Sequence, residues 1–152
     1  MLRGMPENPQ TPYQILGDEG VRALVDDFYD RMDTLPEARR IREMHDVDLS
    51  EIRERLYIFI RGWMGGPAEY AARYGSANIP SLHAPFDIGV EEREAWLLCM
   101  EQALDQSALA TSPLRERVST LFRRMAEMCE TLDESGQLKP HFASIRAEMA
   151  AG

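Results

Sequence analysis

The strongest constraint on this chain is the spacing of its apolar residues, which recur every three or four positions in four long segments. That spacing places the apolar side chains on one face of an α-helix, whereas a half-buried strand would require alternation between neighbouring residues. No segment shows convincing alternation, and no internal repeat appears in the 152 residues. The sequence therefore predicts an all-α fold, organised as one domain over 1–152.

The first half of the chain contains two of the predicted long helices and one short helix. We expect the first long helix over 20–32, with Asp18 as its N-terminal cap. A capping-box spacing in Thr34-Leu35-Pro36-Glu37 then opens a short helix that ends near residue 44. Asp48 caps the second long helix, which the triplet Gly65-Gly66-Pro67 stops abruptly.

The second half contains the other two long helices and a tail. A connection over 67–89 has neither a helical nor a strand period, and such long connections are often functional. The third helix is centred on 96–104, and the fourth occupies 112–132. We expect the C-terminal extension, 133–152, to form a helix that packs on the domain or on another copy of the chain, while 1–11 forms an N-terminal extension.

Charge and cysteine usage limit the partners and the compartment. The formal net charge is −9, so no basic face is available for nucleic acid or for an anionic membrane surface. Cys99 and Cys129 lie inside helical patterns and lack the spacing of a metal site or of covalent haem attachment. No apolar signal segment and no run of eighteen apolar residues is present. We therefore expect a cytoplasmic protein with small or neutral partners.

The usual catalytic motifs are missing, and a histidine in the irregular connection is the main candidate for chemistry. There is no zinc-protease, phosphate-loop, dinucleotide-binding or nucleophile-elbow motif. His83 stands in the irregular segment between Leu82 and Pro85. A lone loop histidine is more often structural or solvated than a ligand, so its position alone leaves both interpretations open.

A set of short motifs resembles the second group of truncated haemoglobins. The resemblance runs with nearly constant spacing from about Tyr13 to Leu104 and continues more weakly through the fourth helix. The motifs that carry it are Phe28-Tyr29, Met44-His45, Asp48-Leu49, Gly65-Gly66-Pro67 with Tyr70, His83-Ala84-Pro85-Phe86, Ile88-Gly89, Glu92-Arg93 and Ala95-Trp96-Leu97.

The resemblance implies a two-over-two helical sandwich around a b-type haem, with His83 as the iron ligand. It also implies that Tyr29, His45 and Trp96 surround the bound gas, each with a group that can donate a hydrogen bond. Such donors stabilise bound dioxygen by about 1 to 3 kcal/mol each. The residues expected to contact the haem are Phe28, Ile52, Leu56, Phe59, Trp63, Tyr70, Arg73, Phe86, Ile88 and Trp96.

These side chains also have ordinary structural interpretations. Tyr29 and Trp96 can be core aromatics, and His45 can be a helix-terminal histidine favoured by the helix dipole. The chain also departs from the family in 75–83, which lacks the Gly-His-Pro turn and the arginines that contact haem propionates in family members. We hypothesise that Tyr70, with Arg73 or Arg61, takes over that contact.

The resemblance implies a gas-binding haem protein that acts on dioxygen, nitric oxide or peroxide with an unidentified reductase, rather than a bulk oxygen carrier. Carbon monoxide should also bind, and nitric oxide dioxygenase or peroxidase-like activity would suit the predicted donors. Tyr29 or His45 could instead occupy the sixth iron position, and a homodimer remains open. The alternative from another class is a haem-free or haem-sensing helical interaction protein that keeps the globin shell.

Overall fold

Helices account for nearly all the regular structure in the computed structural model, which describes residues 11–75 and 78–152. Most of the predicted N-terminal extension therefore lies outside the described residues. The long helices are α1 (Pro12–Thr34), α3 (Ser50–Trp63), α6 (Val90–Asp105), α7 (Arg115–Met128) and α8 (Pro140–Ala151). The short ones are η1 (Pro36–Ala38), α2 (Arg39–Glu43), α4 (Tyr70–Tyr74) and α5 (Ile79–Leu82).

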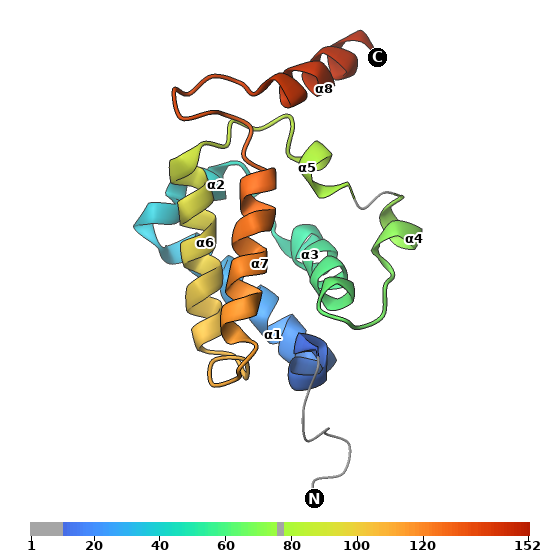
Figure 1. Cartoon of the computed structure of the whole chain (residues 1–152), viewed down its shortest axis with the longest axis vertical. Helices are drawn as coiled ribbons and strands as arrows, with labels where there is room; N and C mark the ends of the chain where they lie inside the picture. Colours follow the sequence, from blue (N-terminus) through green and yellow to red (C-terminus); the bar gives the residue numbers. More distant parts are fainter. Residues whose placement is uncertain (1–10, 76–77) are drawn as a thin grey trace, which may run out of the picture.

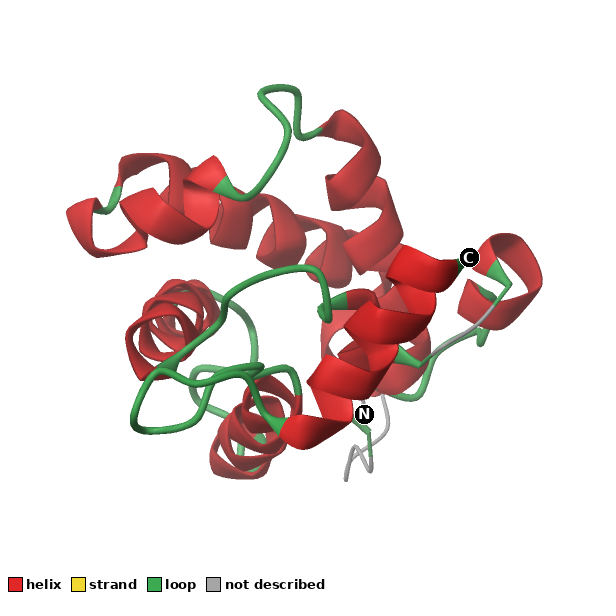
Figure 2. Cartoon of the chain, turned by 90° about the horizontal axis from the view of Figure 1, so that it is seen from above, coloured by secondary structure: helices red, strands yellow, loops and turns green. Residues whose placement is uncertain are grey.

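Two pairs of long helices form the body of the molecule. Helix α1 packs against both α6 and α3, and α6 packs against α7 (Figure 1). The C-terminal helix α8 lies across the end of this body, above the connection between α5 and α6, as the view from above also shows (Figure 2). The all-α prediction and the two-over-two arrangement are confirmed. No helix of the described residues is long and apolar enough to cross a membrane.

An aromatic junction joins the helix pairs at the centre of the core. The Phe122 ring of α7 lies 4.7 Å from the Trp63 ring of α3 and 5.8 Å from the Trp96 ring of α6, measured between centroids. The Trp96 ring is in turn 5.0 Å from the Phe28 ring of α1. All four long helices of the body therefore contribute one ring to a connected cluster, which burial of apolar area stabilises.

The first helix begins earlier than predicted. Thr11 caps it, because the Thr11 hydroxyl accepts from the Gln14 N–H and the Gln14 side chain accepts from the Thr11 N–H. Gly17 interrupts the helix with a φ of 66°, which glycine adopts readily. The predicted cap, Asp18, uses its carboxylate to accept hydrogen bonds from the Tyr13 hydroxyl and from Arg61.

The abrupt end of α3 has a packing reason as well as a conformational one. A side chain at Gly65, whose φ is 102°, would meet the Thr11 side chain, and one at Gly66 would meet the Tyr13 ring at 2.7 Å. The Tyr13 N–H also donates to the Met64 carbonyl. The glycine pair therefore lets the end of α3 contact the start of α1.

Several predicted helix boundaries are wrong. Thr34 ends α1 and donates its hydroxyl to the Asp30 carbonyl, so it does not cap the following helix. The N-cap of α3 is Leu49 rather than the predicted Asp48, which lies one residue earlier and accepts from the Ser50 N–H. Helix α7 ends at Met128 rather than Leu132, and 67–89 contains the short helices α4 and α5.

The buried Phe122 and its exposed neighbour provide a matched test of the core. Phe122 is 1% exposed, whereas its neighbour Leu121 is 36% exposed. Phe122→Ala should lower the free energy of unfolding by about 3–5 kcal/mol, because it empties the space between two tryptophan rings. Urea unfolding at equal haem content measures the change, and Leu121→Ala, with an expected loss within about 0.5 kcal/mol, is the control. Equal losses in the two variants would contradict this account of the core.

Candidate functional site

His83 ends the short helix α5 with its imidazole turned into the protein. The His83 Nδ1 atom lies 2.7 Å from the Ile79 carbonyl oxygen. Because a carbonyl can only accept, Nδ1 carries the proton, which leaves the Nε2 lone pair available. Burial lowers the pKa of His83, the hydrogen bond to Ile79 opposes that effect, and charge on His45 lowers the pKa further. The ring is therefore held as neutral imidazole, the form that binds a metal ion.

His45 has the same hydrogen-bond pattern as His83. It follows α2, and its Nδ1 atom lies 2.8 Å from the Ile41 carbonyl oxygen, so its Nε2 lone pair is also available. Because charge on His45 lowers the pKa of His83, the two imidazoles are close enough to interact electrostatically. The His45 ring also lies 5.9 Å from the Tyr29 ring, so the structure brings these two predicted residues together.

Tyr29 is a buried phenol without a protein acceptor. Its side chain in α1 leaves the residue 3% exposed, edge-on to Phe28 with the ring centroids 4.9 Å apart. No group of the described residues accepts a hydrogen bond from its hydroxyl. Burial raises the pKa of Tyr29 strongly, and the nearby Arg53 guanidinium opposes this only in part. The hydroxyl therefore remains protonated and available as a donor.

Trp96 supplies a second donor beside Tyr29. The indole lies in α6 between Phe28 and Phe122, which fix its position in the aromatic junction. Within the described part of the chain, no acceptor is present for its N–H. Neither donor is among the fully buried unpartnered atoms of the described residues, so both reach accessible space in which a polar ligand can accept their hydrogen bonds.

One side of α3 is apolar and incompletely covered. Four of its side chains pack against the core while remaining partly exposed, unlike Tyr57, Ile58 and Ile60 of the same helix, which are buried. The four are Ile52, Leu56, Phe59 and Trp63. Of the other expected haem contacts, Phe28 is fully buried, Ile88 is half-buried and Phe86 is 38% exposed. The uncovered apolar side of α3 fits a flat apolar group such as a haem.

The cations proposed for the haem propionates have different surroundings. Arg61 is paired with Asp18 at 2.8 Å and with Glu69 at 3.4 Å, so it is already engaged. Arg73 is half-exposed and reaches Glu54 at 3.4 Å. Arg55, which no sequence motif indicated, donates to the Tyr70 hydroxyl at 2.8 Å and has no carboxylate partner among 11–75 and 78–152.

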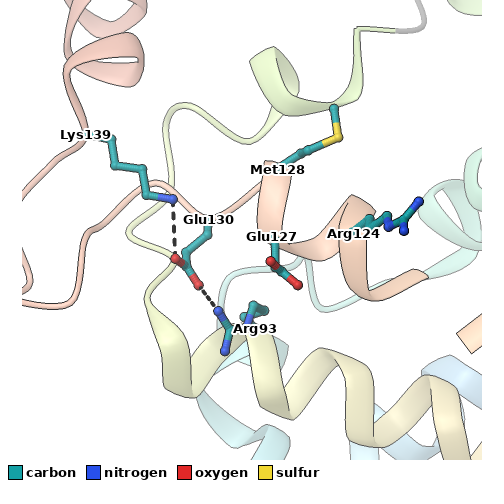
Figure 3. Close-up of a pocket in the computed structure, with 6 residues that line it drawn as sticks. All are labelled: Arg93, Arg124, Glu127, Met128, Glu130 and Lys139. Atoms are coloured by element: carbon teal, nitrogen blue, oxygen red, sulfur yellow. Dashed lines mark hydrogen bonds and ion pairs between the residues drawn. The ribbon is translucent and has the colours of Figure 1, made fainter. Parts of the chain in front are cut away.

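A hollow beside α7 is a different feature. It has a volume of about 500 Å³ and contains none of the residues predicted to bind haem or gas. Figure 3 shows the side chains that line it, which are Arg93, Arg124, Glu127, Met128, Glu130 and Lys139. Because these side chains are mostly charged and open to solvent, the hollow does not suit an apolar cofactor.

Comparisons with known proteins identify the family. A family model for bacterial-like globins matches residues 11–131. The group 2 truncated hemoglobin YjbI of Bacillus subtilis is 31% identical over 135 residues, which cover 86% of this chain and 99% of the relative. The solved group II 2-on-2 hemoglobin of Agrobacterium tumefaciens matches with a TM-score of 0.77 at 37% identity, covering 86% of this chain and 100% of the other. The chain belongs to the group II truncated haemoglobins.

Membership of this family implies a haem cofactor and binding of diatomic gases such as oxygen. The truncated oxygen-avid haemoglobin of Bacillus subtilis is another structural neighbour of this truncated globin, with a TM-score of 0.71 at 30% identity over 80% of this chain and 99% of the other. The residues present fit a haem, since they combine a neutral imidazole, an apolar wall and donors without acceptors. The match to the family model ends at Thr131, so α8 lies beyond it.

Because its pKa is raised, Tyr29 should not contribute to the absorbance change of an alkaline titration. The chain has five tyrosines, and the absorbance of their phenolates can be followed up to about pH 11, one unit above the ordinary tyrosine pKa. Because buried Tyr29 stays protonated there, Tyr29→Phe should leave the absorbance change unaltered. Circular dichroism recorded in parallel checks that both proteins remain folded. A change smaller by one tyrosine in the variant would show that Tyr29 ionises normally.

Proposed function

We propose that this truncated globin binds b-type haem through the His83 Nε2 atom and retains a diatomic gas beside Tyr29, His45 and Trp96. The observation that carries the proposal is the state of His83: its Nδ1 is anchored to the Ile79 carbonyl and its burial keeps the ring neutral. Both properties are those of a metal-binding imidazole. The incompletely covered apolar side of α3 supports the same location for the cofactor.

Haem supplies the iron at which the gas binds, and the residues of this chain set how long the gas stays. The Tyr29 hydroxyl and the Trp96 N–H have no acceptor in the described residues, so both can donate to a polar ligand without first breaking a protein hydrogen bond. His45 offers a third polar group close to Tyr29. This arrangement favours retention of dioxygen over rapid release.

Slow release suits redox chemistry better than transport. We propose that the protein uses dioxygen, nitric oxide or peroxide as substrates, in nitric oxide dioxygenase or peroxidase-like turnover with a separate reductase. The name of the oxygen-avid Bacillus subtilis neighbour describes retention in that protein and supports the comparison. A cytoplasmic location agrees with the two free cysteines, Cys99 and Cys129.

The contact with the haem propionates is proposed for Tyr70 and the cations around it. Tyr70 is buried and lies 5.4 Å from the Phe59 ring, so it borders the proposed cofactor wall. Arg55 donates to its hydroxyl and Arg73 lies on the same short helix α4. Arg61 is less suited, because Asp18 and Glu69 already neutralise it.

Removal of the His83 imidazole is the decisive test of haem ligation. His83→Ala should abolish the Soret band of the purified protein or replace it with the spectrum of weakly held haem, because no other imidazole occupies that position. Absorption spectra of the ferric protein, and of the reduced protein under carbon monoxide, measure the change. Leu121→Ala is the control, since Leu121 lies at an exposed position of α7 outside the site and the C-terminal segment. A normal band in His83→Ala would overturn the proposal.

Replacement of the Trp96 donor tests gas retention. Trp96→Phe keeps an aromatic ring in the junction and removes the N–H, so oxygen release from the ferrous protein should accelerate by about tenfold. Carbon monoxide release should change less, because that ligand is less polar when bound. Stopped-flow mixing of the oxygenated protein with carbon monoxide gives the rate. A fast rate in the unaltered protein, little changed by the substitution, would favour a carrier.

A further inference from the structure

The residues after His83 have almost no regular structure of their own to hold them. Helix α5 has four residues, and the turns that follow are closed by single hydrogen bonds, such as that from the Phe86 N–H to the His83 carbonyl. A helix of this length is not stable by itself in water. The position of the His83 backbone therefore depends on contacts from elsewhere in the chain.

Arg146 of α8 supplies the most extensive of these contacts. Its guanidinium donates to the Ala84 carbonyl at 2.6 Å and to the Phe86 carbonyl at 3.0 Å. The same guanidinium is paired with the Asp87 carboxylate at 2.8 Å. One planar group thus binds three points within the four residues that follow His83, a geometry for which arginine is well suited.

Thr131 holds the next part of the same loop. Its hydroxyl donates to the Phe86 carbonyl at 2.6 Å and accepts from the Ile88 N–H at 2.8 Å. The backbone N–H groups of Thr131 and Leu132 both donate to the Ile88 carbonyl, at 2.9 and 3.0 Å. Thr131 is fully buried, so water does not compete for these bonds.

The segment that carries Thr131 and Arg146 is itself anchored to the body of the molecule. Glu130 is paired with Arg93 of α6 at 2.7 Å and with Lys139 at 3.3 Å, as the dashed lines in Figure 3 show. The Lys139 N–H donates to the Thr131 carbonyl, and Phe142 of α8 is 3% exposed. The loop after His83 is therefore connected through this segment to the body of the molecule, chiefly to α6.

We propose that the segment 129–151, the C-terminal strap, positions His83 for haem binding, with Arg146 and Thr131 as its positioning residues. The proposal rests on the proposed function, because it takes His83 as the haem ligand. The strap touches the loop through backbone carbonyls and the Asp87 carboxylate, so it acts on the placement of the imidazole rather than on its chemistry. Opening of the loop is the step that frees the haem, and the strap slows that step.

The test compares two arginine variants of the holoprotein. Arg146→Ala removes the three contacts to the loop, and Arg124→Ala removes an equal charge from an exposed residue of α7 that has no partner among the described residues. Haem loss is followed by transfer to excess apomyoglobin. We expect loss to accelerate by about tenfold in Arg146→Ala and to remain unchanged in Arg124→Ala.

Two further measurements separate positioning from general stability. Hydrogen exchange of the amides in 84–90 should accelerate at least about fivefold in Arg146→Ala, with no change in α1 or α6. The iron–histidine stretching band of the ferrous protein should shift or broaden, which a merely structural role elsewhere would not cause. Thr131→Val, which keeps the shape of the buried side chain, should give the same changes if Arg146→Ala fails to fold.

The outcomes distinguish the strap from the function on which it rests. An unchanged rate of haem loss and an unchanged iron–histidine band in both Arg146→Ala and Thr131→Val would overturn the proposed role of the strap. Haem ligation by His83 would stand in that case. A normal Soret band in His83→Ala would overturn the proposed function, and with it the role of the strap in haem binding. Faster exchange in 84–90 with normal haem retention would also contradict the proposal.

Discussion

The structure of this truncated globin depends on the contact of Phe122 with Trp63 and Trp96. The three rings belong to α7, α3 and α6, and Phe28 of α1 extends the cluster, so one apolar contact network joins every long helix of the body. Because Phe28 and Phe122 are fully buried and both tryptophans are partly buried against them, close packing sets the positions of the rings. The same packing that stabilises the fold therefore also aims the Trp96 N–H, and structure and candidate site share one set of contacts.

The remaining polar groups of the site are held by backbone rather than by other side chains. His83 and His45 each donate from Nδ1 to a carbonyl four residues earlier, which fixes the ring and leaves the second nitrogen available. The Tyr29 hydroxyl, in contrast, has been placed in the interior without an acceptor among the described residues. Because this hydroxyl is not among the fully buried unpartnered atoms of the described residues, it reaches accessible space in which a ligand can accept its hydrogen bond.

Apolar periodicity was sufficient to predict the fold class and the long helices, because a helix must bury one face wherever it lies. It could not locate the start of α1, because Thr11 and Tyr13 at that start pack against Gly65 and Gly66 at the end of α3, a distant part of the chain. The resemblance named Tyr29, His45, Trp96 and His83. In the structure the Tyr29 ring contacts the His45 ring, and the Phe28 ring lies against both Tyr29 and Trp96. Neither apolar periodicity nor the family resemblance pointed to Arg55 or Arg146, because an isolated arginine on a helix carries no sequence signal until its tertiary partner is known.

The burial of Cys99 and Cys129 sets the reactivity of the two thiols. Both thiols are free, and burial raises the pKa of each to about 11. The reactive species toward peroxide is the thiolate, which is therefore scarce at neutral pH. The chain therefore keeps both thiols protonated and shielded, so neither is a ready target for oxidation or for a disulfide with another molecule.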